Sequence, residues 1–301
     1  MKLIKPSFEI YEQGPGLEGI YEAIERAGRT CYKSQRPENQ TAKNFVDRMI
    51  KSGHGAMLEH GTIYLRVPYY YLDAGNTIPY YEGTAVAKKY GHNKYSKVVY
   101  EYTNEDNDIA EVYITTNYRV LVENDWLDDL KYLCEPTESH EKRVTVRFIT
   151  DRGISHELVR HRVFSFAQES TRYCNYSKDK FGNGLTFIIP SWMDSNEQSI
   201  NTKQGFGVKP REELFAFLGK SERHYFKLLE LGWTPQQARQ VLPNALKTEL
   251  VMTGFTSDWQ HFCRLRTSII AETGKPHPDM SALIDPLYKE FVDRGYMIPL
   301  I

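Results

Sequence analysis

The segment RHRVFSFAQESTRY, residues 160–173, mixes charged and hydroxyl side chains with aromatic ones. Arginine keeps its positive charge, so several arginines in such a segment indicate an anionic partner. If the segment were helical, His161, Ser165, Gln168 and Arg172 would form one polar stripe. The stripe fits two interpretations. One is a partly solvated amphipathic helix, and the other is a cradle in which arginine forks and serine hydroxyls hold a phosphate group.

Arg266 is a second candidate. Apolar residues recur at helical spacing between Trp259 and Ile270, and Arg266 lies within that face. An unpaired guanidinium there would be costly, so we expect a carboxylate or a ligand to meet it. An ion pair inside the chain or across a subunit contact is the alternative to a ligand. Arg239 lies four residues before Pro243, which must bend or end a helix and free backbone groups nearby.

Several common sites are absent from the sequence. His54, Glu59 and His60 do not follow the HExxH spacing and have no third ligand nearby, so no metal site is predicted. The four cysteines form no CxxC pair, which favours free thiols in a reducing compartment. There is no P-loop and no dinucleotide fingerprint after a strand, so any flavin would bind outside a Rossmann frame.

The composition is that of an ordinary globular protein, with 301 residues, 41% hydrophobic, 26% charged and a net charge of -1. No global positive field would recruit nucleic acid. The start, MKLIKPSFEI, lacks the apolar run of a signal peptide, and no segment has the ~20 apolar residues of a membrane span. We therefore expect a cytoplasmic protein without nucleic-acid or membrane partners, folded as one domain over residues 1–301.

Hydrophobic periodicity predicts the elements that must position these residues. Helices are expected over residues 17–30, 44–53, 117–133, 211–232, 235–254, 257–274 and 279–295. Strands are expected over residues 62–70, 95–102, 110–116 and 142–150, and another within 185–192. Strands in the first half and helices throughout predict an α/β protein of the α+β type, a mixed β-sheet packed by helices.

Arg160-His161-Arg162, then seven residues, then Ser170 resembles the RHR-x7-S signature of the flavin-dependent thymidylate synthases. AGRTCYKS, GHGAMLEHGTIYLRV, ARQVLPNALKTE, WQHFCRLR and PHPDM resemble further segments of that family, in the same order. The resemblance spans roughly residues 27 to 281. It implies the family's non-Rossmann fold, with insertions near residues 69–116 and 174–210.

The resemblance also implies a reaction. The enzyme would methylate dUMP to dTMP, with the carbon from 5,10-methylenetetrahydrofolate and reducing equivalents from NADPH through FAD. Members of the family are homotetramers whose active sites are shared between subunits, and they are not thought to use a cysteine to activate the nucleotide.

Site residues follow from the resemblance by position. Those expected to bind dUMP are Arg160, Gln168, Ser170, Arg172, Arg239 and Arg266. The phosphate would lie with Ser170, Arg172 and Arg239 and the pyrimidine beside Arg266, and Arg266 and Ser170 are the candidate catalytic residues. Those expected to bind FAD are Ser34, His54, Ala56, Arg160, His161, Arg162, Gln168, His261 and His277.

The chain departs from the family where Ala167 and Gln168 replace the usual Asn-Glu pair, followed by Glu169. Either Gln168 suffices in place of the glutamate, or Glu169 turns inward. Two other interpretations are a non-enzymatic nucleotide- or RNA-binding module that uses the same arginines and neighbouring tyrosines, and a divergent flavoenzyme of the same fold.

Overall fold

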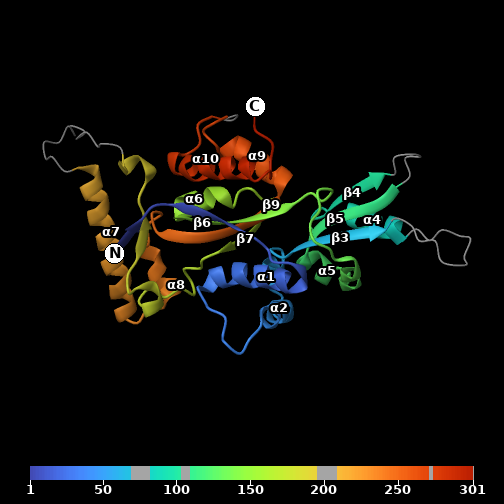
Figure 1. Cartoon of the computed structure of the whole chain (residues 1–301). Helices are drawn as coiled ribbons and strands as arrows, with labels where there is room; N and C mark the ends of the chain where they lie inside the picture. The colour runs from blue at the N-terminus through green and yellow to red at the C-terminus, as the bar shows by residue number, and fades with distance from the viewer. Residues whose placement is uncertain (69–81, 103–108, 195–208, 271–273, 301) are drawn as a thin grey trace, which may run out of the picture.

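The computed structural model describes residues 1–68, 82–102, 109–194, 209–270 and 274–300. Three sheets and the helices around them make up an elongated molecule (Figure 1). The central sheet has four antiparallel strands in the order β2-β6-β9-β7. They are β2 (Ser7–Tyr11), β6 (Arg143–Asp151), β9 (Lys247–Phe255) and β7 (Ser165–Gln168).

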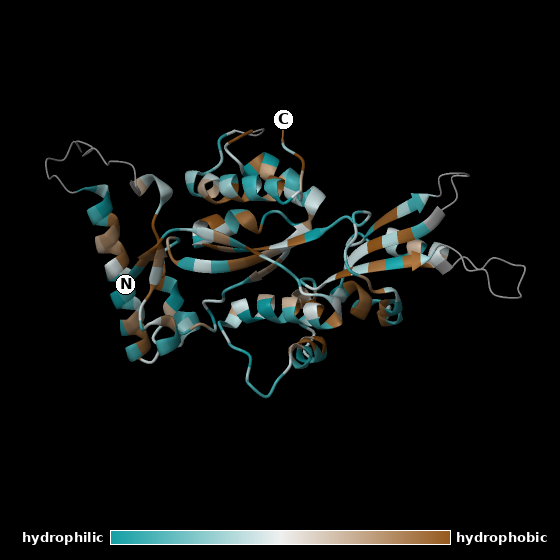
Figure 2. Ribbon diagram, in the orientation of Figure 1, coloured by the Kyte–Doolittle hydropathy of each residue, from teal (hydrophilic) through white to brown (hydrophobic). Residues whose placement is uncertain are grey.

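Helices cover both faces of the central sheet (Figure 1). On one face lie α6 (Arg152–Leu158), α9 (Thr256–Arg266) and α10 (Pro278–Asp293). On the other lie α1 (Gly16–Tyr32) and α2 (Ala42–Lys51). These elements carry many apolar residues, coloured brown in Figure 2, and those of β6, β9, α6, α9 and α10 form one buried core. Trp259 and Phe262 of α9 are fully buried among strand and α10 side chains, which anchors α9 to the sheet.

A second sheet, in the order β3-β5-β4, extends from one end of the molecule. Its strands are β3 (Thr62–Pro68), β5 (Ile109–Asn117) and β4 (Lys97–Tyr102). The elements beside it are α3 (Gly55–Leu58), α4 (Glu82–Gly91), α5 (Tyr118–Glu123) and η1 (Leu127–Tyr132). In the predicted insertion at 69–116, residues 69–81 and 103–108 lie outside the described residues.

The opposite end carries the small parallel pair β1 (Lys2–Ile4) and β8 (Thr186–Ile188). Around it lie η2 (Asp179–Phe181), η3 (Ser191–Asp194), α7 (Pro210–Glu230), α8 (Pro235–Ala238) and η4 (Arg239–Val241). In the predicted insertion at 174–210, residues 195–208 lie outside the described residues. No helix in the described part of the chain is long and apolar enough to span a bilayer.

The predicted class, a mixed α/β protein, is confirmed, but three predicted helices and one hypothetical helix differ. The helix over 235–254 is wrong, because the chain makes only α8 and η4 before it becomes β9. That strand is buried on both faces, and a continuous apolar run does not distinguish such a strand from a helix. The hypothetical helix at 160–173 is instead a set of turns followed by β7. The helix over 117–133 is split near Asp125, which has φ +57°, and α9 ends at Arg266 instead of reaching residue 274.

Candidate functional site

Ser170 lies just after β7, against the end of α1. Its backbone N–H donates to the carbonyl oxygen of Cys31 over 3.0 Å. Its Oγ accepts a hydrogen bond from the backbone N–H of Arg172 over 3.2 Å. The end of α1 therefore fixes the backbone at Ser170, and the local turn orients its hydroxyl.

Arg239 reaches the same segment from η4. The Thr234–Gln237 capping box starts α8, and the chain turns at Arg239 before Pro243. The Nη1 of Arg239 donates to Oγ1 of Thr171 over 3.4 Å. The Arg172 guanidinium is exposed over the ring of Tyr173, 5.3 Å from its centre.

Neither Arg172 nor Arg239 has a carboxylate partner among the described residues. Arg239 of η4 thus lies beside the segment that carries Ser170 and Arg172. Two guanidinium groups and a hydroxyl are a donor set suited to a phosphate. Of the three residues that were predicted to hold the phosphate, Ser170 and Arg172 share one turn, and Arg239 contacts Thr171 between them.

Arg266, Glu157 and His161 form a second cluster. Nη1 of Arg266 lies 2.9 Å from Oε2 of Glu157, and its Nε donates to Nε2 of His161 over 2.9 Å. Since an arginine can only donate, Nε2 must be the unprotonated nitrogen of a neutral His161. Burial first, then Arg266 and His261, lower the pKa of His161 to about 4. His161 is therefore an uncharged acceptor at neutral pH.

Arg266 does not stand on a continuous apolar face, because α9 ends at this residue and Glu157 supplies a carboxylate. The ion pair inside the chain, which was the alternative expected from sequence, is present. It is partly open to water, since the side chain of Arg266 is 23% exposed and that of Glu157 38%. Both residues, with Arg160, line an open hollow of about 500 Å³. A ligand could reach Arg266 from this hollow.

Gln168 and Glu169 point to different partners. Nε2 of Gln168 donates to the Oγ of Ser155 over 2.9 Å and to Oγ1 of Thr248 over 3.2 Å. Glu169 is buried, 2.8 Å from Nζ of Lys247, and accepts from the hydroxyl of Tyr176 over 3.0 Å. The carboxylate at this part of the chain is therefore that of the buried Glu169, paired with Lys247, while the amide of Gln168 is hydrogen-bonded to two hydroxyl groups.

The remaining predicted cofactor residues lie apart from one another. Arg160 and Arg162 are exposed in the turns after α6, and neither meets a carboxylate among the described residues. His54 caps the start of α3 and Ala56 follows within it. His261 lies on α9 and His277 caps α10. Ser34 follows α1 and accepts from Arg29.

One chain does not gather the predicted cofactor residues into a single pocket. The Ser170 cluster lies beside α1, whereas the Arg266 cluster lies between α6 and α9. Nowhere in the described ranges do three His, Cys, Asp or Glu side chains gather as metal ligands.

All four thiols are held in the protonated form. Burial raises the pKa of Cys31 and of Cys134 above the ordinary value. It raises the pKa of Cys174 to about 11 and that of Cys263 to about 12. Because the thiolate is the nucleophile, these cysteines are poorly suited to attack a pyrimidine.

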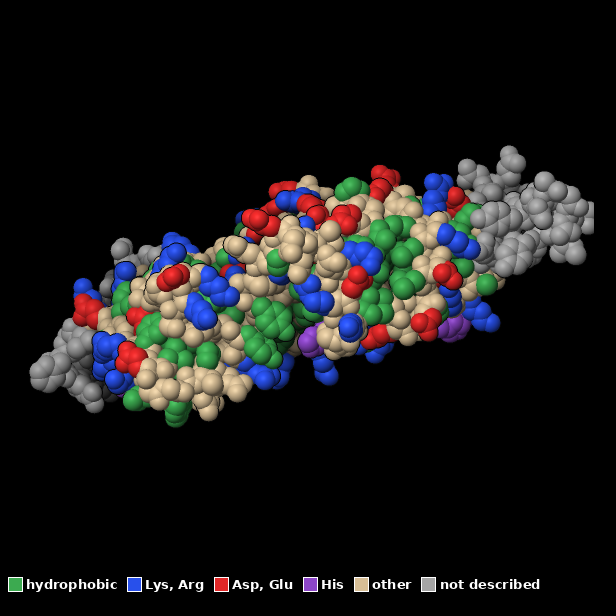
Figure 3. All heavy atoms as spheres, turned by 90° about the horizontal axis from the view of Figure 1, so that it is seen from below, with side chains coloured by type: hydrophobic (Ala, Val, Ile, Leu, Met, Phe, Trp, Pro, Cys, Tyr) green, Lys and Arg blue, Asp and Glu red, His purple; other side chains and the backbone are tan. Residues whose placement is uncertain are grey.

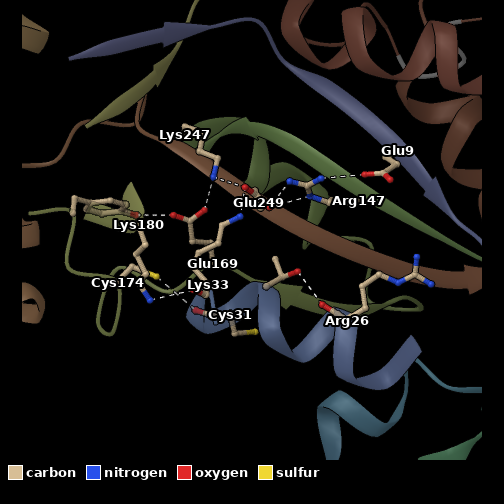
Figure 4. Close-up of polar contacts among 12 residues, drawn as sticks. Glu9, Arg26, Cys31, Lys33, Arg147, Glu169, Cys174, Lys180, Lys247 and Glu249 are labelled. Atoms are coloured by element: carbon tan, nitrogen blue, oxygen red, sulfur yellow. Dashed lines mark hydrogen bonds and ion pairs between the residues drawn. The ribbon is translucent and has the colours of Figure 1, made fainter. Parts of the chain in front are cut away.

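Sequence reasoning missed a buried ion network centred on Glu249 of β9 (Figure 4). Its carboxylate contacts Lys33, lies 2.5 Å from Nζ of Lys247 and 2.7 Å from Nη2 of Arg147. The spacing of Lys247 and Glu249 places both on one face of a strand, but only if the segment is read as a strand. The incorrect helix prediction hid this signal.

The family model described as thymidylate synthase complementing protein, Thy1, matches residues 98–293. The chain belongs to this family. A probable flavin-dependent thymidylate synthase of Paramecium bursaria Chlorella virus 1 is 30% identical over 153 residues, 49% of this chain and 67% of that protein. The flavin-dependent thymidylate synthase of Corynebacterium aurimucosum is 34% identical over 126 residues, 40% of this chain and 48% of that protein.

The chain thus matches about half the length of the bacterial relative and two thirds of the viral one. Among solved structures, the UMP/dUMP methylase PolB from Streptomyces cacaoi bound with 5-Br dUMP is similar with a TM-score of 0.44 and 14% identity. That alignment covers 97% of this chain and 93% of the other. The family predicted from the RHR-x7-S signature is confirmed by the family model and the curated relatives.

Proposed function

We propose that this chain is a flavin-dependent thymidylate synthase, which methylates dUMP to dTMP. In this proposal 5,10-methylenetetrahydrofolate donates the carbon, and NADPH supplies reducing equivalents through FAD. Membership of the family and the names of the curated relatives support the assignment.

The position of Arg239 beside the segment that carries Ser170 and Arg172 is the observation that carries the proposal. The two arginines come from separate segments, and no carboxylate in the described part of the chain neutralises them. A nucleotide phosphate would supply the missing negative charge and accept from the Ser170 hydroxyl. Arg266, from its open ion pair with Glu157, would orient the pyrimidine.

The residues also fit a flavin nucleotide. Arg160 and Arg162 are exposed and free of carboxylates among the described residues, so their guanidinium groups can donate to phosphate oxygens. The flavin, when bound, supplies the redox chemistry. His161 stays neutral beside Arg266 and can donate from Nδ1. Gln168, Ser34, His54, Ala56, His261 and His277 complete the proposed FAD residues.

The separation of these residues within one chain supports a homotetramer that shares its active sites. The Ser170 cluster at α1 and the Arg266 cluster at α6 would then meet the same ligands from different subunits. We place the enzyme in the cytoplasm, where four free thiols would stay reduced. A single domain with two insertions remains our prediction for the chain.

One observation favours a second candidate, a divergent flavoenzyme of the same fold. Gln168 stands where the family has glutamate, and its amide is bound to Ser155 and Thr248. If the reaction requires a carboxylate at that position, the chain would bind flavin and nucleotide without methylating dUMP.

Release of tritium from 5-labelled dUMP distinguishes the two candidates. With FAD, NADPH and methylenetetrahydrofolate present, we expect steady release that stops when either co-substrate is omitted. Flavin absorbance near ~450 nm should accompany the purified protein. Flavin-loaded protein that binds dUMP but releases no tritium would establish the second candidate instead.

A further inference from the structure

A basic cavity of about 1090 Å³ lies where the end of α1, the central sheet and the loop after η2 meet. Seven of its lining side chains are cationic, and Glu249 is the one acidic side chain that lines it. Figure 3 shows the side of the molecule on which α1 and α2 lie, where Lys and Arg side chains are prominent. Among the residues proposed to bind dUMP or FAD, Ser34 is the one that lines this cavity.

Three half-buried cations of the cavity share one carboxylate, that of Glu249. Lys33, Arg147 and Lys247 all point at Glu249 (Figure 4). Among the described residues, two other carboxylates contact these cations: Glu169 pairs with Lys247, and the exposed Glu9 pairs with Arg147. The crowding of positive charge is visible at Lys33, where burial and then Lys247 lower the pKa of the ammonium group.

Of the remaining cations of the cavity, Arg29 pairs with Glu25, a carboxylate that it shares with Arg36. Arg26 donates to the carbonyl oxygen of Glu12 over 2.6 Å and lies over the ring of Tyr11.

Lys180 donates to the carbonyl oxygens of Tyr32 and Lys33, over 3.4 and 3.1 Å, and lies over the ring of Phe181, with no carboxylate partner among the described residues. The backbone of Lys2 bonds to Leu185, but its ammonium group has no partner in the described part of the chain. The seven cationic side chains thus contact four carboxylates, those of Glu9, Glu25, Glu169 and Glu249, and Glu25 also pairs with Arg36. Positive charge is therefore in excess among the described side chains around this hollow.

We propose that this cavity binds a small polyanion, a ligand with clustered phosphate or carboxylate oxygens, separately from the residues proposed to hold the phosphate of dUMP. The volume is that of a site for a small molecule and exceeds the needs of a single ion. Low-dielectric walls around like charges raise the local concentration of anions. The cavity adjoins the Ser170 segment, since Lys180 and Ser170 both bind carbonyl oxygens at the end of α1. A ligand held here would lie next to the nucleotide.

Lys2, Arg26 and Lys180 are the residues with which to test the site. All three are exposed and lack a carboxylate partner among the described residues, so replacing them with glutamine strands no buried charge. Lys43→Gln in α2 is the matched control, because Lys43 is an exposed lysine that pairs with Asp47 outside the cavity. Thermal unfolding of each variant should match that of the wild type.

Titration calorimetry with sodium tripolyphosphate measures binding. The protein is used with its flavin as purified and with saturating dUMP, so that the proposed dUMP phosphate site is filled. We expect the wild type to bind the probe, with an affinity that falls steeply as salt is added. At fixed salt, the affinity should be ~3-fold lower in each single variant and at least ~30-fold lower in the triple variant. Lys43→Gln should bind like the wild type. A parallel titration with a γ-linked triglutamate tells whether the site prefers phosphate or carboxylate oxygens.

The outcomes separate clearly. Binding of either probe that is lost in the triple variant supports the site. If neither probe binds, the cavity is filled or covered in the folded protein and the proposal is overturned. Equal binding by the wild type and the triple variant also overturns it. None of these measurements requires turnover, so failure of the thymidylate synthase reaction would leave the result intact.

Discussion

Arg266 donates a hydrogen bond from Nε to Nε2 of His161 over 2.9 Å, which ties the last turn of α9 to the turn after α6. The same guanidinium reaches Glu157 of α6 with Nη1. Arg266 and His161 thus lie in contact without charge repulsion, because His161 is neutral. The arrangement fixes the orientation of both side chains at the edge of an open hollow.

Arg266→Ala should change nucleotide binding more than it changes stability. The pair with Glu157 is partly exposed, so its loss should cost less than ~1 kcal/mol of the free energy of unfolding. Affinity for dUMP should fall at least ~10-fold, which is about 1.4 kcal/mol. Calorimetric titration and thermal unfolding measure the two effects.

Glu157→Gln is the control for this prediction. It removes the carboxylate but keeps Arg266, so dUMP binding should persist. An Arg266→Ala protein that unfolds, or that binds dUMP unchanged, would mean that the ion pair is purely structural.

The free energy of unfolding should depend on the protonation of His161. In the unfolded chain a histidine titrates near ~6.5, whereas the pKa of His161 is about 4 in the folded protein. Between these values the unfolded chain binds the additional proton, so stability falls as the pH drops through this window.

His161→Gln keeps an acceptor oxygen for Arg266 but does not titrate. Denaturant unfolding at several pH values should show a shallower loss of stability for this variant than for the wild type between about pH 6.5 and pH 4. If stability falls equally with pH in the two proteins, His161 has the same pKa in the folded and the unfolded chain, which would contradict this prediction.

Glu249→Gln should be strongly destabilising. Burial raises the pKa of the Glu249 carboxyl, but Lys247 and Lys33 outweigh it and lower that pKa to about 2. Removing the charge leaves Lys33, Lys247 and Arg147 crowded together, and breaking a buried pair typically costs ~3 kcal/mol or more. Denaturant unfolding at pH 7 measures the loss.

Glu9→Gln is the matched comparison on the same network, because Glu9 pairs with Arg147 but is 58% exposed. Its effect should stay below ~1 kcal/mol. Equal losses in the two variants would contradict the account of the buried network.

The thiols should react slowly and be dispensable. Burial raises the pKa of Cys31 and Cys134, so little thiolate is present at neutral pH. Iodoacetamide should label the folded protein much more slowly than free cysteine does at pH 7.5. Cys31→Ala and Cys134→Ala should each retain tritium release. Abolition of release in a folded variant would identify a nucleophilic thiol.

The sequence allowed prediction of those features that depend on local spacing. The alternation in β6 and the periodicity of α1, α7 and α10 predicted these elements correctly, because each buries a single face. β9 was mistaken for a helix because both of its faces are buried, which removes the alternation. The turns at 160–164 were missed because polar spacing alone does not distinguish the local hydrogen bonds of successive turns from those of a helix.

The candidate site shows the same division. Ser170, Arg172 and Arg239 were predicted from motifs, and the structure places Arg239 against Thr171, between the other two. The partner of Arg266 could not be named, because Glu157 lies 109 positions away and only the fold brings it near. Lys33, Arg147, Lys247 and Glu249 come from three distant segments, so no spacing pattern connects them.

The proposal that Ser170, Arg172 and Arg239 hold the phosphate of dUMP is tested most directly by comparing the dissociation constants of dUMP and deoxyuridine. Each charge-assisted hydrogen bond to the phosphate should contribute ~1.5 kcal/mol or more, so the wild type should bind dUMP at least ~100-fold more tightly than deoxyuridine. Arg172→Gln and Arg239→Gln should each reduce that ratio by ~10-fold, while Arg211→Gln, an exposed arginine of α7, should leave it unchanged. Equal affinity for nucleotide and nucleoside, or a ratio that survives both substitutions, would contradict the account.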